Sequence, residues 1–501
     1  MSTVLVANRG EIACRILRAC NEAGYSSIAI YADNDANSLF VELATTSVRL
    51  QGETITETYL NQKQILEIAA EYGADAIHPG FGFLSERADF AQAVIDSGIS
   101  WIGPSPRAIE MMGDKMTART TMKAANVPVI PGEEIEEEDE HEALIAIRNA
   151  SERVGFPLLL KASSGGGGKG MRVVNSPEEL DDAVSGARRE AIAAFGDGRV
   201  YVERLLSGAK HVEIQVLADQ QGRIIHLGER ECSIQRRHQK VFEEAPCPTM
   251  TPDLRQRMGD AAILAAKAVD YVGAGTVEFL LASSGEFFFL EMNTRIQVEH
   301  PVTEMVTGVD IVREQLRIAE GEPMSCGELS MRGHSIEVRL YAEDATNNFL
   351  PAIGPLLVFK PPVGPGVRLD TGVREGDEVT PNYDPMLAKL VVWAPSRNEA
   401  LQRMRRALDD FVVLGTTTNI RFLRELCDQE DVVNGSTDTT LIERVWPDGW
   451  NPNISNSLSE AALMIAGISE GSGKHRQNNS NSDSADNGPA SPFSTLSRRY
   501  P

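Results

Sequence analysis

Apolar residues in the first part of the chain follow two alternating spacings. The segments STVLVA, SIAIYAD and DAIHPG contain short apolar runs typical of buried strands. In EIACRILRACNEAG and QKQILEIAAEYG, apolar residues recur at the spacing of amphipathic helices. Strands that alternate with helices indicate a parallel sheet with crossover helices on its faces. The pattern therefore predicts a doubly wound α/β domain over residues 1–112.

The stretch KASSGGGGKGMR places Gly165, Gly167 and Gly170 at the G-x-G-x-x-G spacing of a dinucleotide-binding loop. That fingerprint needs a strand before the glycines and a helix directly after them. GFPLLLKAS predicts the strand, but the short, partly β-branched MRVVN predicts a second strand. A Walker A loop is excluded as well, because Met171 and Arg172 follow the last glycine. We expect either a flexible hairpin tip or a flap whose backbone N–H groups close over phosphates.

The rest of the chain predicts a mixed architecture. Ser176, Pro177 and Glu179 have the spacing of a helix start with a capping box, and the acidic run EEIEEEDEHE is expected to be a solvated loop. Farther on, HSIEVRLYAED, VRLDTGV and LAKLVVW predict strands, and NEALQRMRRALDDF predicts a helix. We therefore expect α/β and α+β domains at 1–112, at 113–331 with a lid subdomain at about 132–206, and at 332–450.

Composition and charge exclude several classes of protein. The chain has 501 residues, 42% of them hydrophobic, which suffices for about three or four domains with substantial cores. No run approaches the roughly 18 apolar residues of a membrane helix. The net charge of −24 repels nucleic acid and anionic membranes. An anionic substrate therefore requires a local basic cluster.

Location and terminal order are also predicted from composition. The N-terminus has no signal-peptide layout, and the six cysteines form no C-x-x-C pair or metal-ligand spacing. These features predict a soluble cytoplasmic protein with reduced thiols. The small polar residues at 470–501 cannot offset their ordering entropy, so we expect a disordered tail there.

The segment GTVEFLLASSGEFFFLEMNTRIQVEH predicts a hairpin. With Ser284 and Gly285 at the centre of its turn, Glu278 lies directly opposite Glu291, with Cβ atoms about 4.5–5.5 Å apart, where like charges are destabilising. Asn293 points to the same face. Two carboxylates and an amide oxygen suit Mg²⁺ or Mn²⁺. In the alternative, a three-residue loop shifts the register by one, and one glutamate faces solvent.

Charged residues near the hairpin extend this candidate site. Arg295, Gln297 and Glu299 continue the same alternation if the chain stays extended, which would put a guanidinium, an amide and a carboxylate beside the metal. The basic run RRHQK at 236–240 is a solvated face unless it lies near the metal site.

These residues carry a resemblance: from Thr3 to Trp446 the chain resembles the biotin carboxylases of the ATP-grasp superfamily. The matching motifs are ANRGEIACRI, HPGFGFLSE, MGDK, KASSGGGGKGMR, HVEIQVL, RRHQKVFEEAP, GAGTVEF, EMNTRIQVEHPVTE and EVRLYAED. Together they are specific, whereas the glycine run alone is not. The resemblance implies an N-terminal parallel sheet, a central ATP-grasp fold with a glycine-rich lid over the ATP phosphates, and a mixed C-terminal domain.

The resemblance also implies roles for the residues at matching positions. ATP would contact the cofactor-binding residues Lys115, Lys161, Gly165, Gly166, Gly167, Gly168, Lys169, Gly170, Met171, Glu203, Arg204, Leu205, Leu206, His211, Gln235, His238, Glu278 and Glu291. The metal ligands would be Glu278, Glu291 and Asn293, which the hairpin suggests independently. Bicarbonate would be held by Lys240, Arg295, Gln297 and the backbone N–H of Val298. The catalytic residues would be Arg295, Lys240, the base Glu299, and Arg339, which would bind biotin and stabilise its enolate.

The implied activity is carboxylation of biotin on a separate carrier protein, with ATP, Mg²⁺ or Mn²⁺ and bicarbonate, through carboxyphosphate. The chain would be a homodimeric subunit that performs the first half-reaction of a multisubunit acyl-CoA carboxylase, with a separate carboxyltransferase. No Met-Lys-Met turn occurs in the sequence, and Lys389 lies in a predicted strand. A pyruvate carboxylase subunit is the first alternative. Another ATP-grasp ligase, or a nucleotide-binding protein without catalysis, is less compatible with RRHQK and RIQVEH.

Overall fold

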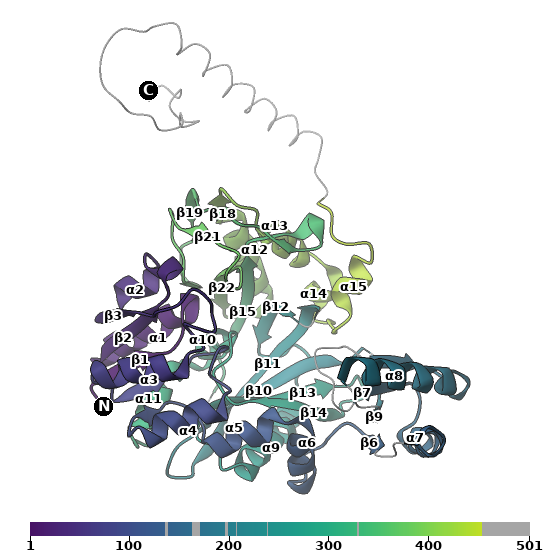
Figure 1. The fold of residues 1–501 in the computed structure, drawn as a ribbon. Helices are drawn as coiled ribbons and strands as arrows, with labels where there is room; N and C mark the ends of the chain where they lie inside the picture. The colour runs from purple at the N-terminus through teal and green to yellow at the C-terminus, as the bar shows by residue number, and fades with distance from the viewer. Residues whose placement is uncertain are drawn as a thin grey trace, which may run out of the picture. The chain divides into compact units, whose positions relative to one another are not determined.

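The computed structural model describes most of the chain (Figure 1), namely residues 1–135, 139–162, 171–195, 199–206, 208–237, 239–327 and 330–452. The predicted flap glycines, Lys169, His238 and the predicted tail lie outside the described residues. Contacts divide the chain into two units, Met1–Gly449 and Trp450–Pro501, and every element below belongs to the first. In the described part, no helix has the length and apolar character needed to cross a membrane.

The N-terminal sheet has the strand order β3-β2-β1-β4-β5, and every neighbouring pair is parallel. Its strands are β1 (Thr3–Val6), β2 (Ser26–Tyr31), β3 (Thr46–Arg49), β4 (Ala76–His78) and β5 (Ser100–Trp101). The helices around it are α1 (Gly10–Ala23), η1 (Asp33–Asp35), α2 (Leu39–Leu43), α3 (Gln62–Glu71), α4 (Ala88–Asp96) and α5 (Pro106–Gly113). Val4 and Val6 pack in one core with α1, and Leu5 packs in another with α3 and α4. Both faces are therefore covered, which confirms the doubly wound prediction.

A smaller antiparallel sheet has the order β6-β9-β7-β8. Helix α6 (Lys115–Ala124) precedes it, and its elements are β6 (Gly132–Ile135), α7 (Glu140–Val154), β7 (Leu158–Ala162), β8 (Met171–Val174), η2 (Pro177–Glu179), α8 (Leu180–Phe195) and β9 (Val200–Arg204). Leu158 and Leu160 pack with α7 and α8 in one core, so both helices cover one face. Strands β7 and β8 pair directly, which confirms that the glycine run joins two strands.

Two local predictions in this region are wrong. The acidic run is not a loop throughout, because β6 pairs with β9 and α7 begins at Glu140. Charged residues are tolerated there because β6 is an edge strand. The capping box is also absent: the Ser176 side chain caps nothing, and Glu179 accepts a hydrogen bond from the Asn175 N–H at 2.9 Å. A 3₁₀ turn therefore starts this helix.

The largest sheet has eight strands in the order β14-β13-β10-β11-β12-β15-β22-β20. Their bounds are β10 (Lys210–Ala218), β11 (Ile224–Arg236), β12 (Gln239–Ala245), β13 (Gly273–Leu281), β14 (Phe287–Asn293), β15 (His334–Tyr341), β20 (Val367–Thr371) and β22 (Met386–Ala394). Phe242 of β12 pairs with Val338 of β15. The sheet therefore contains paired strands from both sides of residue 331, where the sequence predicts a boundary between two domains.

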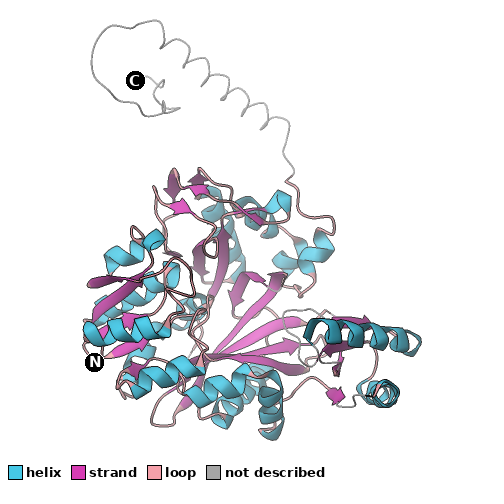
Figure 2. Cartoon of the chain, in the orientation of Figure 1, coloured by secondary structure: helices cyan, strands magenta, loops and turns pink. Residues whose placement is uncertain are grey.

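Helices and short strands border this sheet (Figure 2). The helices are α9 (Pro252–Ala268), α10 (His300–Thr307), α11 (Ile311–Ala319), η3 (Ala345–Asn347), α12 (Arg397–Asp410), α13 (Ile420–Leu426), α14 (Glu430–Asn434) and α15 (Leu441–Val445). The short strands are β16 (Glu343–Asp344), β17 (Leu350–Pro351), β18 (Gly354–Pro355), β19 (Val358–Lys360), β21 (Glu378–Val379) and β23 (Val412–Leu414). Helix α12 starts with a capping box made by Ser396 and Glu399.

One face of the large sheet forms the core and the other carries charge. Val212 and Ile214 of β10 pack with α9 together with Val277 of β13. The residues between them along the strands, including Glu213 and Glu278, therefore point to the opposite face. The alternation of apolar and charged positions in HVEIQVL and TVEFLL thus places buried charges on a single surface.

Candidate functional site

Glu278 and Glu291 are directly paired on β13 and β14, as the hairpin prediction required. The turn itself differs from the prediction, because Ala282 N–H bonds to Glu286 O at 2.8 Å and leaves a three-residue loop. That loop alone would shift the register by one. A β-bulge between Glu278 and Phe279, where β14 contributes the extra residue Leu290, restores the pairing. The two carboxylates are opposed because of the bulge.

The Lys240 ammonium lies among three carboxylates. Its Nζ donates to Glu213 at 2.6 Å, to Glu278 at 2.9 Å and to Glu299 at 2.6 Å. Burial alone would lower the pKa of Lys240, but the carboxylates outweigh it and raise that pKa well above its ordinary value. Lys240 is therefore a fixed cation at the centre of the site, and RRHQK is not merely a solvated face.

The Arg230 guanidinium is fully buried and shares the Glu213 carboxylate with Lys240. It donates to Glu213 at 2.5 Å, to Thr276 at 3.1 Å and to the Gln297 side-chain oxygen at 2.9 Å. Gln297 in turn donates to Glu278 at 2.8 Å. Arg230 therefore fixes the amide of Gln297 relative to the carboxylate pair.

Glu299 lies between two cations, immediately before α10. One carboxylate oxygen accepts from Lys240, and the other accepts from the Arg339 Nη2 at 3.1 Å. Desolvation would raise the pKa of Glu299, but Lys240 and Arg339 outweigh it and hold that pKa well below its usual range. Glu299 is therefore ionised and close to both groups that could hold a small anion.

Arg295 connects the hairpin to the N-terminal domain. Its guanidinium donates to the Asn293 side-chain oxygen at 2.9 Å and pairs with Glu86 at 2.9 Å. Asn293 also donates its amide hydrogen to Glu278 at 2.9 Å. The structure thus brings together all the predicted metal and bicarbonate residues, with Val298 following Gln297 in the chain.

Of the predicted nucleotide residues, His211 and Gln235 lie beside this cluster. His211 lies 2.9 Å from a Glu278 oxygen, and its Nδ1 is 3.0 Å from the Gln235 amide. Lys161 is ion-paired with Glu203, two residues predicted to contact ATP. Arg204 is exposed and Leu205 and Leu206 are half-buried.

The fit of a divalent cation can be judged from the carboxylate pair. Among the described residues, Glu291 has no hydrogen-bond or ion-pair partner, and desolvation and the Glu278 carboxylate raise its pKa. A cation between the two glutamates would relieve this repulsion, so the donor set suits Mg²⁺ or Mn²⁺. Asn293 presents its nitrogen to Glu278, and a half-turn of the amide would present its oxygen. His211, Glu213 and Glu278 form another possible ligand set, but Glu213 already binds Arg230 and Lys240.

A cavity of about 500 Å³ lies beside Arg339 and Val298. Phe81 and Phe83 supply apolar lining, whereas Gln239 and Asp384 supply polar groups. Loops of the N-terminal domain and strands of the C-terminal region both contribute. The cavity therefore offers space for a partly apolar molecule next to the Arg339 guanidinium.

Several site residues were missed by the sequence analysis, namely Glu86, Glu213, Arg230 and Glu243. Glu243 accepts a bond from Arg339 at 2.6 Å. Glu213 lies directly between the apolar Val212 and Ile214, which is a sequence signal for a buried charge, whereas Arg230 and Glu243 each stand beside another charged residue in the sequence. Glu86 comes from a distant loop, so only the fold places it.

Comparisons with known proteins agree with this arrangement. Three family models match: "Biotin carboxylase, N-terminal domain" over residues 1–109, "Carbamoyl-phosphate synthase L chain, ATP binding domain" over 114–326, and "Biotin carboxylase C-terminal domain" over 337–444. A biotin carboxylase of Nostoc is 48% identical over 88% of this chain and 98% of its own length. The mitochondrial methylcrotonoyl-CoA carboxylase subunit alpha of Dictyostelium discoideum is 45% identical over 95% of this chain and 69% of its own length.

A solved structure is also similar. The biotin carboxylase domain dimer of the Hydrogenobacter thermophilus 2-oxoglutarate carboxylase, in complex with MgADP, ADP and bicarbonate, shares 44% identity with a TM-score of 0.81. The alignment covers 89% of this chain and 98% of that one.

Proposed function

The chain belongs to the biotin carboxylase family of ATP-dependent ligases, and from that premise we propose that it uses ATP and bicarbonate to carboxylate biotin. The observation that carries the proposal is the position of Glu299. Its two carboxylate oxygens contact Lys240 and Arg339, the two cations beside which bicarbonate and biotin would bind. A base, an anion site and a cavity for the acceptor thus meet at one point.

The bicarbonate site would be formed by Lys240, Arg295, Gln297 and the backbone N–H of Val298. Bound bicarbonate would compete with Glu299 for the Lys240 ammonium. Since Lys240 is a main cause of the lowered Glu299 pKa, that competition would raise the pKa and make Glu299 a better base. The same cation would thus hold the substrate and release the base.

The ATP phosphates would lie near Lys115 and Lys161, with Glu203 to Leu206, His211 and Gln235 along the nucleotide. Glu278, Glu291 and Asn293 would hold the divalent cation, which when bound would neutralise phosphate charge. Lys161 would exchange its contact with Glu203 for phosphate. We also propose that ATP contacts His238 and Gly165–Gly170, which lie outside the described residues.

These groups account for each proton and each bond in the proposed reaction. Glu299 takes the proton of bicarbonate, whose oxygen attacks the γ-phosphorus as the bond to ADP breaks. Carboxyphosphate then separates into CO₂ and phosphate, and the phosphate takes the N–H proton of biotin as the N–C bond to CO₂ forms. Arg339 would stabilise the negative charge on the biotin ureido oxygen, since its guanidinium lines the cavity.

We further propose that the biotin belongs to a separate carrier protein, in line with the match of this chain to 98% of the length of the Nostoc biotin carboxylase. The final acceptor would be an acyl-CoA, reached through a carboxyltransferase subunit; pyruvate is the alternative. We propose a homodimer, as in the similar 2-oxoglutarate carboxylase domain. A cytoplasmic location is supported by the six free cysteines.

Release of ADP by the purified chain tests the proposal. We expect turnover of ATP to require bicarbonate and to rise with free biotin, and Glu299→Gln to abolish it without loss of the folded state. Turnover that requires an amine and a carboxylic acid in place of bicarbonate would instead identify another ATP-grasp ligase.

A further inference from the structure

Lys389 is a buried charge that the proposed chemistry does not use. It lies in the middle of β22, directly opposite Arg339 of β15 on one side and Asp370 of β20 on the other, and its side chain has 0% exposure. Lysine is rarely fully buried unless it is paired. The contacts of its ammonium should therefore explain why it is there.

The Lys389 ammonium joins three parts of the molecule. It donates to the backbone oxygen of Val298 at 2.9 Å and lies 2.9 Å from an oxygen of Glu11, at the start of α1. Asp370 is more distant, at 3.8 Å, and is held by Arg368 through bonds of 2.9 and 2.7 Å. Glu11 is thus the carboxylate in closest contact with Lys389, and Val298 is the residue whose backbone oxygen Lys389 binds. The buried Glu337 also interacts with Lys389 electrostatically, without a hydrogen bond.

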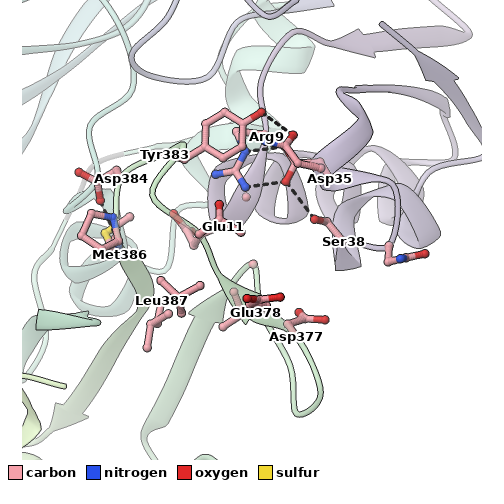
Figure 3. A pocket seen from close by; sticks show the side chains of 18 of the residues that line it. Arg9, Glu11, Asp35, Ser38, Asp377, Glu378, Tyr383, Asp384, Met386 and Leu387 are labelled. Carbon is pink, nitrogen blue, oxygen red and sulfur yellow. Dashed lines mark hydrogen bonds and ion pairs between the residues drawn. The ribbon is translucent and has the colours of Figure 1, made fainter. Parts of the chain in front are cut away.

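The surroundings of Glu11 are visible at the boundary of the N-terminal domain (Figure 3). Arg9, Glu11, Tyr383 and Leu387 all line a cavity of about 350 Å³, and the Arg9 guanidinium lies against the Tyr383 ring, 3.8 Å from its centre. Beyond its ion pair with Lys389, Glu11 has no side-chain hydrogen bond among the described residues. The Glu11 contact holds the start of α1 against β22, which carries Lys389, and Arg9 contacts the loop that precedes β22.

The Val298 carbonyl matters because each peptide group is planar. The bond from Lys389 fixes the plane between Val298 and Glu299, and His300 fixes the preceding plane by a contact of 2.7 Å to the Gln297 oxygen. The Val298 N–H lies in the plane that His300 holds, and the plane that Lys389 holds sets the starting point of the Glu299 side chain relative to that N–H. No other described group donates to the Val298 oxygen.

We infer that Lys389 is a positioning residue for bicarbonate: it holds the Val298–Glu299 peptide so that the Val298 N–H and the Glu299 carboxylate address one anion. This inference rests on the proposed function. In this inference Glu11 orients the Lys389 ammonium. Packing of the N-terminal domain on β22 thereby sets the geometry of residues 297–299, which we call the bicarbonate loop.

The test compares Lys389→Met with the double variant Glu11→Gln, Lys389→Met. Lys389→Met leaves Glu11 buried without its cation, so a lower melting temperature is expected. The double variant removes both charges and should recover much of that loss. Neither variant restores a donor to Val298, so we expect both to raise the KM for bicarbonate about tenfold or more, with the KM for ATP nearly unchanged.

Lys210→Met is a matched control. Lys210 also binds a buried glutamate and backbone oxygens, Glu231 at 3.2 Å and Thr437 at 2.6 Å, but it does not contact the bicarbonate loop. The Lys210→Met variant should have a lower melting temperature than wild type and an unchanged KM for bicarbonate. Lys389→Arg, which keeps a donor, should recover part of the affinity.

Two results would overturn the inference. If the double variant recovers both its melting temperature and its KM for bicarbonate, Lys389 only balances the charge of Glu11. An unchanged KM in soluble Lys389→Met would have the same meaning. A wild-type chain without bicarbonate-dependent ADP release would instead refute the proposed function, and the inference with it.

Discussion

Replacing Glu291 by glutamine should move stability and metal affinity in opposite directions. Glu278 and Glu291 are directly paired, which puts their Cβ atoms about 5 Å apart. Two unit charges at that distance repel by about 3 kcal/mol at an effective dielectric constant near 20. Because the Glu291 side chain reaches solvent, screening reduces this to roughly 1–2 kcal/mol. Glu291→Gln should therefore stabilise the metal-free protein.

The same substitution removes one of two anionic ligands, so the Mg²⁺ concentration for half-maximal ADP release should rise about tenfold or more. In thermal unfolding with EDTA, the melting temperature of the variant should exceed that of wild type by roughly 2–4 °C per kcal/mol, the ratio for a domain of about 150–250 residues. Glu286→Gln, in the exposed turn of the same hairpin, is the matched control and should change neither quantity. A destabilised metal-free variant with an ordinary Mg²⁺ requirement would refute the reasoning.

Further predictions concern the buried charges and thiols. Burial raises the pKa of Glu243 from 4.5 to about 7. The protonated carboxyl therefore stabilises the folded protein fully below pH 4.5, and this stabilisation is lost as the pH rises through 7. Glu243→Gln cannot ionise, so its melting temperature relative to wild type should increase between these two pH values. Arg230→Met should cost about 3–5 kcal/mol of unfolding free energy, because Glu213 stays buried without its guanidinium partner; an unchanged melting temperature would contradict this. Burial raises the pKa of Cys14 and Cys427 to about 12, so both should resist alkylation in the native protein and react after denaturation, as peptide mapping would show.

The sequence predicts most of what depends on local pattern. Alternation along strands places Glu278 on the charged face, and helix spacing identifies α1 and α12. The hairpin turn could not be predicted, because a three-residue loop and a bulge at Leu290 together give the register expected from a two-residue turn.

Long-range contacts explain the other differences. Glu86 and Glu11 come from segments far from the hairpin in sequence, and no local signal pairs them with Arg295 and Lys389. The edge strand β6 was missed because its acidic residues have low strand preference, and pairing with β9 decides its conformation.

Transfer of label from radioactive bicarbonate to free biotin tests the central claim most directly. With the purified chain, ATP and Mg²⁺, we expect acid-labile label in biotin, equal in amount to the biotin-dependent ADP released. Glu299→Gln should give no label and should melt as a folded protein. Label-free biotin from a folded, ATP-cleaving chain would contradict the account.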